Sequence, residues 1–96
     1  MFYCSAFCLA NANQVLKIHV GLDKVTLFGD TELLSGPQKW YGGLLGSDGN
    51  LYGIPNCSSS VLRVIPIKDE VELFGNLPPG NWKWHGGMAD STGDVM

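Results

Sequence analysis

The pentapeptide Lys39-Trp40-Tyr41-Gly42-Gly43 returns 44 residues later as Lys83-Trp84-His85-Gly86-Gly87. A second matching pair, Val15-Leu16-Lys17-Ile18 and Val61-Leu62-Arg63-Val64, is 46 residues apart. Periods of this length are typical of units that cannot bury their apolar face alone and therefore stack on copies of themselves, as in propeller blades or helical arrays. The 96 residues of the chain hold about two such units.

The match extends beyond these motifs and divides the chain into four segments. Residues 15–29 agree with residues 61–75 at seven of 15 positions, and residues 83–96 agree with residues 39–52 at six of 14. The segments are residues 1–13, which match the repeat poorly; 14–37, a half repeat with the third and fourth strands and a connector; 38–81, a complete repeat with its connector; and 82–96, a half repeat with the first and second strands. Within the first segment, Phe2-Tyr3-Cys4 is interpreted as a degraded second strand.

Turn signals divide the complete repeat into four short strands. They are expected over Trp40 to Leu45, Leu51 to Ile54, Val61 to Ile65 and Glu70 to Phe74. Asp48-Gly49 predicts a tight two-residue hairpin turn, in which both central residues need a positive φ. No segment has the 3.6-residue apolar period of a helix. The sequence therefore predicts an all-β fold, with about two propeller-type blades of antiparallel strands forming an incomplete propeller.

Apolar and polar residues alternate along the expected third strands. Lys17 lies between Leu16 and Ile18, and the matching Arg63 also lies between two aliphatic residues. Successive side chains of a strand point to opposite faces. Each third strand is therefore expected to place aliphatic side chains on one face and a cation on the other, as half-buried antiparallel strands do.

Glycine and aspartate recur at matched positions of the repeat. The glycine pair after each matched tryptophan suits the innermost strand of a blade, because a missing Cβ lets neighbouring backbones approach closely. The matched aspartates lie between the third and fourth strands, where aspartate starts a turn by bonding to its own backbone. These structural repeat positions are Gly42, Gly43, Gly86, Gly87, Asp48, Gly49, Asp23 and Asp69.

One repeat pattern carries a resemblance to known proteins. Lys-Trp-x-Gly-Gly, a glycine-containing turn, Tyr52-Gly53-Ile54-Pro55, a polar loop, Val-Leu-Arg-Val and Phe-Gly resemble repeats in long, poorly characterised proteins that look like β-propellers. The likeness covers the chain from about Gln14 to the C-terminus. The pattern has neither the Gly-His and Trp-Asp pairing of WD40 repeats nor the glycine placement of kelch repeats. The resemblance implies a fold more than an activity.

Composition and charge argue against several classes of partner. A formal charge of -3 and a pI of about 5.0 leave no basic surface, so no nucleic-acid partner is expected. No run approaches the roughly 20 apolar residues of a membrane-spanning helix, so no membrane partner is expected. Residues 1–12 lack the positive start and the full apolar core of a signal peptide, so the sequence assigns no compartment. Cys4, Cys8 and Cys57 complete neither a disulfide framework nor a zinc site.

Four aromatic residues are candidate ligand contacts, namely Trp82, Trp40, Trp84 and His85. Aromatic rings can stack on a sugar or another flat ligand. Trp40 and Trp84 share one repeat position beside glycines, which favours packing between blades. Trp82 has no aromatic counterpart and is therefore the more interesting exposed residue. His85 replaces a tyrosine, which favours a structural role.

No residue pattern predicts a catalytic, cofactor-binding or metal site. Asp48, Asp90 and Asp94 carry oxygen ligands suited to calcium, but no Asp-x-Asp-x-Asp-Gly run supports such a site. The three consecutive serines of residues 58–60 have no partner base at a suggestive spacing. The sequence therefore favours a protein that is not an enzyme and has no cofactor.

The sequence predicts a structural or ligand-presenting β-propeller repeat module that is a fragment of a longer protein. Its expected partners are the missing blades of a longer parent chain, or identical chains. Two alternatives stay open: part of a six-bladed hydrolase of the lactonase type, and a short lectin-like chain that closes a propeller by homo-oligomerisation. Because the repeat is cut within a unit at both ends, unpaired edges are expected, and disordered aggregation is favoured over closure into a ring.

Overall fold

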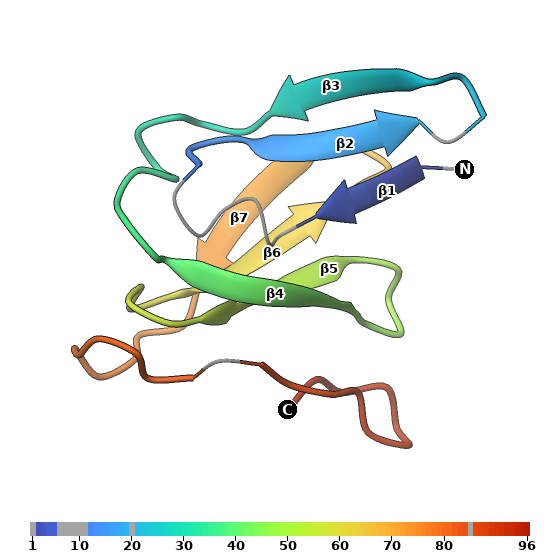
Figure 1. The fold of residues 1–96 in the computed structure, drawn as a ribbon. Helices are drawn as coiled ribbons and strands as arrows, with labels where there is room; N and C mark the ends of the chain where they lie inside the picture. Colours follow the sequence, from blue (N-terminus) through green and yellow to red (C-terminus); the bar gives the residue numbers. More distant parts are fainter. Residues whose placement is uncertain (1, 6–11, 20, 85) are drawn as a thin grey trace.

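The computed structural model shows two antiparallel sheets and describes residues 2–5, 12–19, 21–84 and 86–96 (Figure 1). The first sheet has the strand order β1-β2-β3, and the second has the order β4-β5-β6-β7. The strands are β1 (Phe2–Ser5), β2 (Val15–His19), β3 (Lys24–Phe28), β4 (Trp40–Leu45), β5 (Leu51–Pro55), β6 (Val61–Ile65) and β7 (Glu70–Phe74). No helix occurs among the described residues. The expected all-β fold class is confirmed.

The strands of the second sheet follow the turn signals of the sequence. β4, β6 and β7 begin and end at the expected residues, and β5 extends by one residue to Pro55. β4 is irregular between Trp40 and Gly43, where Gly42 has a φ of 71°. Glycine adopts a positive φ at no steric cost, so the bulge explains one glycine of the pair.

The loop between β4 and β5 differs from the expected two-residue turn. The N–H of Gly46 donates to the carbonyl of Asn50 at 2.8 Å, which leaves the three residues 47–49 as the loop. Gly49 has a φ of 84°, whereas Asp48 is not left-handed, and its carboxylate accepts the N–H of Asn50 at 3.0 Å. The prediction of two positive φ angles is wrong, because a three-residue hairpin loop needs only one left-handed residue, which Gly49 supplies.

The paired strands β2–β3 and β6–β7 have the same register. Leu16 lies opposite Leu27 in the first sheet, and their counterparts at a spacing of 46, Leu62 and Leu73, lie opposite each other in the second. β1 pairs with β2 as β5 pairs with β6. The first sheet therefore has a counterpart of the second strand as well as of the third and fourth.

The described residues of 83–96 form no named strand, yet their backbone contacts match those of β4 and β5. The bridge between Ala89 and Val95 corresponds to the pairing of Leu45 with Leu51, 44 residues earlier. The bonds that close the two loops also correspond: Gly46 N–H to Asn50 O at 2.8 Å, and Asp90 N–H to Asp94 O at 2.7 Å. We call residues 83–96 the C-terminal segment.

The approach to each Lys-Trp motif has one local conformation. The Nζ of the lysine donates to the carbonyl three residues earlier, at 2.6 Å for Lys39 and 2.7 Å for Lys83. The preceding residue is left-handed in both places, with φ angles of 48° for Gln38 and 57° for Trp82. The sequence period thus recurs in the backbone.

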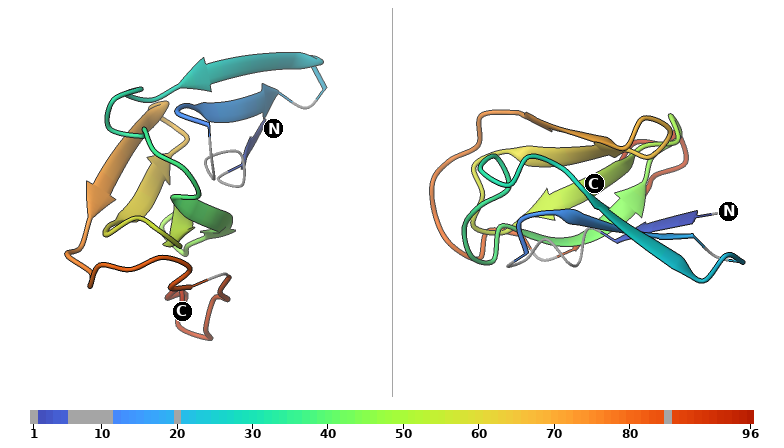
Figure 2. Two further views of the ribbon diagram at one scale, coloured as in Figure 1. Left: turned by 60° about the vertical axis from the view of Figure 1, so that its left-hand side comes forward. Right: turned by 90° about the horizontal axis from the view of Figure 1, so that it is seen from above.

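The first sheet, the second sheet and the C-terminal segment follow one another in space (Figure 2). The second sheet therefore has an inner face, toward the first sheet, and an outer face, toward the C-terminal segment. The core lies between the two sheets, and its fully buried members are Val15, Leu34, Trp40, Leu62 and Val64. Burying one such side chain fully stabilises the fold by about 1.5–3 kcal/mol. Leu34 belongs to the connector between the sheets, so the connector is part of the core.

The cation of β2 faces this core. The exposed fraction of Lys17 is 7%, whereas that of its aliphatic neighbour Ile18 is 37%. The alternation expected for β2 is present, but the face that packs against the second sheet is the Lys17 face and not the aliphatic face. The physical reason is that the second sheet covers the Lys17 face of β2, while no described residues form a layer over its aliphatic face.

Candidate functional site

A groove of about 830 Å³ lies between the outer face of the second sheet and the C-terminal segment. Its walls include Tyr52, Arg63 and Phe74 from the sheet, and Trp84 and Met96 from the C-terminal segment. Side chains alternate between the faces of a strand, so burial of Leu62 and Val64 in the core directs Arg63 into the groove.

Arg63 is the cation among the described residues that line the groove, which also include Asp48, Asp90 and Asp94. Its Nη1 lies 2.8 Å from Oε2 of Glu72, and its guanidinium carbon lies 4.4 Å from the ring centroid of Phe74 and 5.6 Å from that of Tyr52. Tyr52 first, and then Glu72, raise the pKa of Arg63, so the side chain is cationic. A guanidinium above two rings suits a partner that has both a carboxylate and apolar surface.

The β4–β5 loop holds a carboxylate at the edge of the groove. The hydroxyl of Tyr52 donates to Oδ2 of Asp48, and the backbone N–H and the side-chain amide of Asn50 also donate to this carboxylate. These bonds, led by that from Tyr52, hold the pKa of Asp48 below its ordinary value. Asp48 therefore stabilises its own loop and fixes the ring of Tyr52 against the groove.

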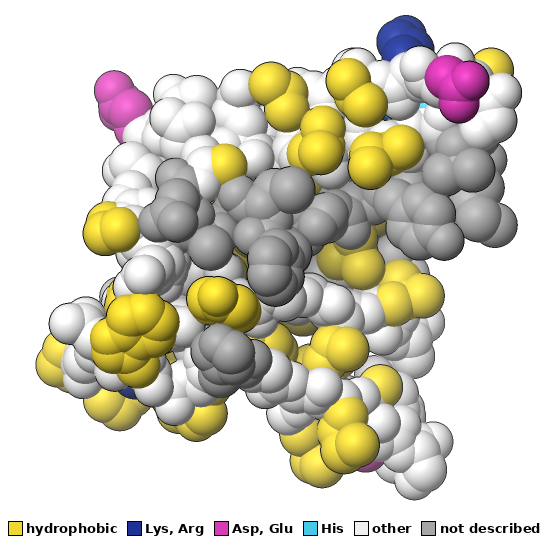
Figure 3. All heavy atoms as spheres, viewed as in Figure 1, with side chains coloured by type: hydrophobic (Ala, Val, Ile, Leu, Met, Phe, Trp, Pro, Cys, Tyr) yellow, Lys and Arg dark blue, Asp and Glu magenta, His cyan; other side chains and the backbone are white. Residues whose placement is uncertain are grey.

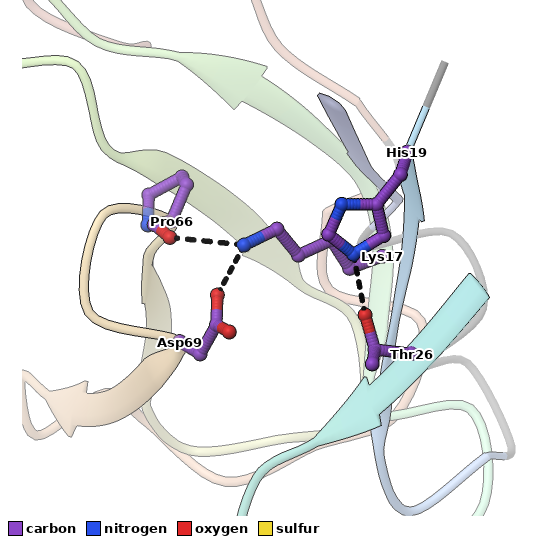
Figure 4. A network of polar contacts seen from close by, with 5 residues as sticks. All are labelled: Lys17, His19, Thr26, Pro66 and Asp69. Atoms are coloured by element: carbon purple, nitrogen blue, oxygen red, sulfur yellow. Dashed lines mark hydrogen bonds and ion pairs between the residues drawn. The ribbon is translucent and has the colours of Figure 1, made fainter. Parts of the chain in front are cut away.

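On the inner face, Lys17 connects the two sheets (Figure 4). Its Nζ lies 2.5 Å from Oδ1 of Asp69, in the turn between β6 and β7, and 3.5 Å from the carbonyl of Pro66. Asp69 and its counterpart Asp23 are both left-handed, with φ angles of 53° and 49°. Aspartate tolerates this conformation. The structure adds a contact that the turn position alone does not indicate, because Asp69 forms an ion pair across the sheets.

The expected aromatic contacts lie in different environments. Trp40 is 1% exposed, and its Nε1 donates to the carbonyl of Ser60 at 2.8 Å. Trp84 and Trp82 are 46% and 60% exposed. Trp84 lines the groove, whereas Trp40 and Trp82 line a smaller hollow of about 510 Å³. The fourth candidate, His85, lies outside the described residues.

Gly87 shows the close approach that was expected of the glycine pairs. A Cβ at this position would lie 2.4 Å from the carbonyl oxygen of Met96 and 3.2 Å from Cδ1 of both Leu44 and Ile54. At Gly86, by contrast, a Cβ would meet nothing within 4 Å. A side chain at Gly87 would therefore disturb the pairing within the C-terminal segment first, and would also crowd Leu44 of β4 and Ile54 of β5.

The aspartates of the C-terminal segment bind their own loop. Oδ1 of Asp90 accepts the N–H of Thr92 at 2.8 Å and that of Asp94 at 3.0 Å. The hydroxyl of Thr92 contributes most to lowering the pKa of Asp90. Within the described residues, no group of three or more His, Cys, Asp or Glu side chains is placed to hold a metal ion.

Comparison with protein-family models, with curated proteins and with solved structures finds no match to this chain. In the described part of the chain, no helix has the length and apolar character needed to cross a membrane.

Three residues of the groove, Arg63, Tyr52 and Phe74, were not among the contacts expected from the sequence. The signal that indicates Arg63 is its match with Lys17, since both repeats place a cation at this position. Tyr52 and Phe74 have no comparable signal, because an aromatic residue in a strand is as common in a core as in a groove.

Proposed function

We propose that the chain is a structural, ligand-presenting repeat module of the β-propeller type. Its two sheets are consecutive blades, and its C-terminal segment is the beginning of a third. The role of such a module is to stack on further blades, and the groove is the place where the next layer, or a ligand held between layers, binds the second sheet.

The observation that carries this proposal is that the two sheets bury opposite faces. In a β-sandwich, two sheets pack their apolar inner faces against each other. Here the aliphatic face of β6, with Leu62 fully buried, packs against the Lys17 face of β2. The aliphatic face of β2, which matches that of β6 in the repeat, points away from the second sheet. Front-to-back packing of this kind supports stacking in one direction, as blades do.

The position of the C-terminal segment supports the same direction of stacking. The segment follows the second sheet on the side away from the first (Figures 1 and 2). Its bridge between Ala89 and Val95 matches the end of the β4–β5 pair. A strand that starts a third layer would occupy this place.

An additional copy of residues 38–81, inserted after Asn81, tests the proposal. Stacked repeats gain stability from each unit and from each new interface. We therefore expect the longer chain to unfold in one transition, with a higher urea midpoint than the parent. A chain with the same 44 residues in shuffled order is the matched control.

A single unfolding transition with a higher urea midpoint is expected only if the inserted unit stacks on its neighbours. If the true repeat and its shuffled control gave the same midpoint, or if proteolysis removed the inserted repeat while the rest stayed folded, the blade proposal would be refuted. A readout by far-ultraviolet circular dichroism during unfolding shows whether the inserted residues form strands and melt with the parent.

A further inference from the structure

We propose that a second copy of this chain fills the groove, by placing the outer face of its first sheet on the outer face of the second sheet. The outer face of the first sheet is the one that points away from the second sheet. This inference rests on the proposed stacking of blades and names the partner. By repeat position, the two outer faces match the two inner faces that already pack against each other between the sheets of one chain.

The outer face of the first sheet is an exposed apolar surface. The exposed fractions of Ile18, Val25 and Leu27 are 37%, 62% and 61%. Hydrophobic side chains gather over β2 and β3 in Figure 3. The counterparts of these residues in the second sheet lie in or against the core under the first sheet: Val64, Val71 and Leu73. The exposed surface therefore has the composition of an interface that is occupied elsewhere in the same molecule.

The outer face of the second sheet is the matching other half. Arg63 and Phe74 occupy the repeat positions of Lys17 and Phe28, whose side chains cover the inner face of the second sheet. Phe74 is 39% exposed, whereas Phe28 packs against the core. The groove thus presents to solvent the same kind of surface that β2 and β3 present to β6 and β7.

One charged pair, matched across the repeat, gives the register of the association. Within the chain, Lys17 pairs with Asp69 across the sheets at 2.5 Å. The repeat counterparts of this pair are Arg63, which projects into the groove, and Asp23, which is exposed in the turn between β2 and β3. In the assembly, Arg63 of one copy pairs with Asp23 of the next.

The sheet edge agrees with this register. β1 pairs with β2 as β5 pairs with β6, and β5 has β4 on its other side. The C-terminal segment matches β4 and, at Val95 and Met96, the start of β5, and it borders the groove. When the first sheet of a second copy enters the groove, it lies in one layer with this segment, so that the layer is formed by two chains.

The association is head-to-tail, since each copy uses two different faces. Such an interface closes into a ring when its rotation allows and otherwise extends as an open stack. Size-exclusion chromatography with light scattering, over a concentration series of the 96-residue chain, is the first measurement. We expect masses above the 10.4 kDa of one chain that increase with concentration. A mass of one chain throughout the series would overturn the proposal.

A charge exchange tests the register. Asp23→Arg and Arg63→Asp each place like charges together, and we expect each variant to associate at least about tenfold more weakly than the parent. A mixture of the two variants restores an Asp–Arg pair at both kinds of contact, so association should return. Glu32→Lys changes the net charge as much as Asp23→Arg, but in the connector, and should associate as the parent does. Association that is equal in all variants, or a mixture without recovery, would show disordered aggregation and overturn the pairing.

Arginine is less suited than aspartate to the left-handed backbone of position 23, so Asp23→Asn is a second variant that retains this conformation. It removes the charge and should weaken association while the circular dichroism spectrum stays that of the parent. Unchanged association in Asp23→Asn and in Arg63→Gln together would contradict the proposed ion pair.

Leu27→Gln and Leu73→Gln form a matched pair at one repeat position. Leu27 is 61% exposed, and Leu73 packs against the core. We expect Leu27→Gln to weaken association with an unchanged urea midpoint for the dilute chain, and Leu73→Gln to lower that midpoint. Equal association of Leu27→Gln and the parent would argue against docking through this face. The stacking proposal itself is tested separately, by the insertion of residues 38–81, and that experiment is carried out on dilute chains so that association does not contribute.

Discussion

Trp40 and Trp84 occupy one position of the repeat, yet their exposed fractions are 1% and 46%. The ring of Trp40 belongs to the core cluster with Leu62 and Leu34, and its Nε1 bonds to the carbonyl of Ser60. Trp84 has no comparable cover among the described residues. The same residue type therefore has a structural role in one copy and borders the groove in the other, because its burial depends on the layer that lies over it.

Replacing Trp40 with alanine should lower the free energy of unfolding by about 3–5 kcal/mol, the range for large aromatic residues in cores. The variant loses both the packing of the ring and the partner of the Ser60 carbonyl. Urea unfolding of dilute protein measures the change. Trp82→Ala is the control, since its ring is 60% exposed and a surface substitution is expected to stay within about 0.5 kcal/mol. Equal midpoints for the two variants would contradict the assignment of Trp40 to the core.

Lys17 shows why a side chain can be misassigned from its strand pattern. Alternation correctly places Lys17 and its aliphatic neighbours on opposite faces, but it does not say which face is covered. That depends on the layer against which the strand packs, and Asp69, the partner of Lys17, is 52 residues away in the sequence. In the sequence, such a contact between layers is indicated by the match of Lys17 with Arg63 and of Asp23 with Asp69.

At the scale of elements, the hairpin loop is stabilised by the hydrogen bonds of one carboxylate. Asp48 accepts bonds from the Tyr52 hydroxyl and from Asn50, and Gly49 supplies the left-handed residue. The corresponding loop of the C-terminal segment uses Asp90, whose carboxylate accepts the N–H groups of Thr92 and Asp94. Both loops therefore depend on an ionised aspartate, although the two aspartates occupy different positions of the repeat.

Acid should loosen the β4–β5 loop. The hydrogen bonds from Tyr52 and Asn50 hold the pKa of Asp48 below its ordinary value in the folded chain. A carboxyl group with a depressed pKa stabilises the fold above its unfolded pKa, and this contribution is lost as the pH falls through the folded pKa. Carboxyl carbon NMR should therefore give Asp48 a titration midpoint below that of an ordinary aspartate, and the urea midpoint should fall as the pH drops through the pKa of Asp48.

Tyr52→Phe is the matched control for this titration, because it removes the largest cause of the shift and retains the ring. The pKa of Asp48 should rise toward its ordinary value in this variant. An unchanged midpoint for Asp48 would show that the Tyr52 hydroxyl does not bond to it in solution.

The sequence predicts the strands of the second sheet well, because each is bounded by a proline, a glycine or a polar turn. β4, β6 and β7 agree at both ends with the expected bounds. It predicts the loop at residues 47–49 poorly, since Asp-Gly fits both a two-residue turn and a three-residue loop, and the choice depends on the register of the flanking strands. The groove could not be predicted, because it is formed by residues from β5, β6, β7 and the C-terminal segment together.

At the scale of the whole molecule, front-to-back packing gives the two faces of each sheet different roles. The second sheet uses its aliphatic face for the core and its Arg63 face for the groove. The first sheet uses its Lys17 face for the core and leaves the other exposed. Stability within the chain therefore depends on one interface between layers, to which both sheets and the connector contribute.

This single core should make the two sheets unfold together. Leu34, in the connector, is fully buried beside Val15 of the first sheet and Leu62 of the second. Leu34→Ala should lower the free energy of unfolding by about 2–5 kcal/mol, because it opens a cavity between both sheets. Leu33→Ala is its neighbouring control, since Leu33 is 45% exposed.

Tryptophan fluorescence, which reports on Trp40 at the interface, and far-ultraviolet circular dichroism, which reports on all strands, should shift to the same lower midpoint in Leu34→Ala. Two separate transitions, with the strand signal persisting after the tryptophan signal is lost, would show that a sheet folds on its own and that the interface does not hold the molecule together.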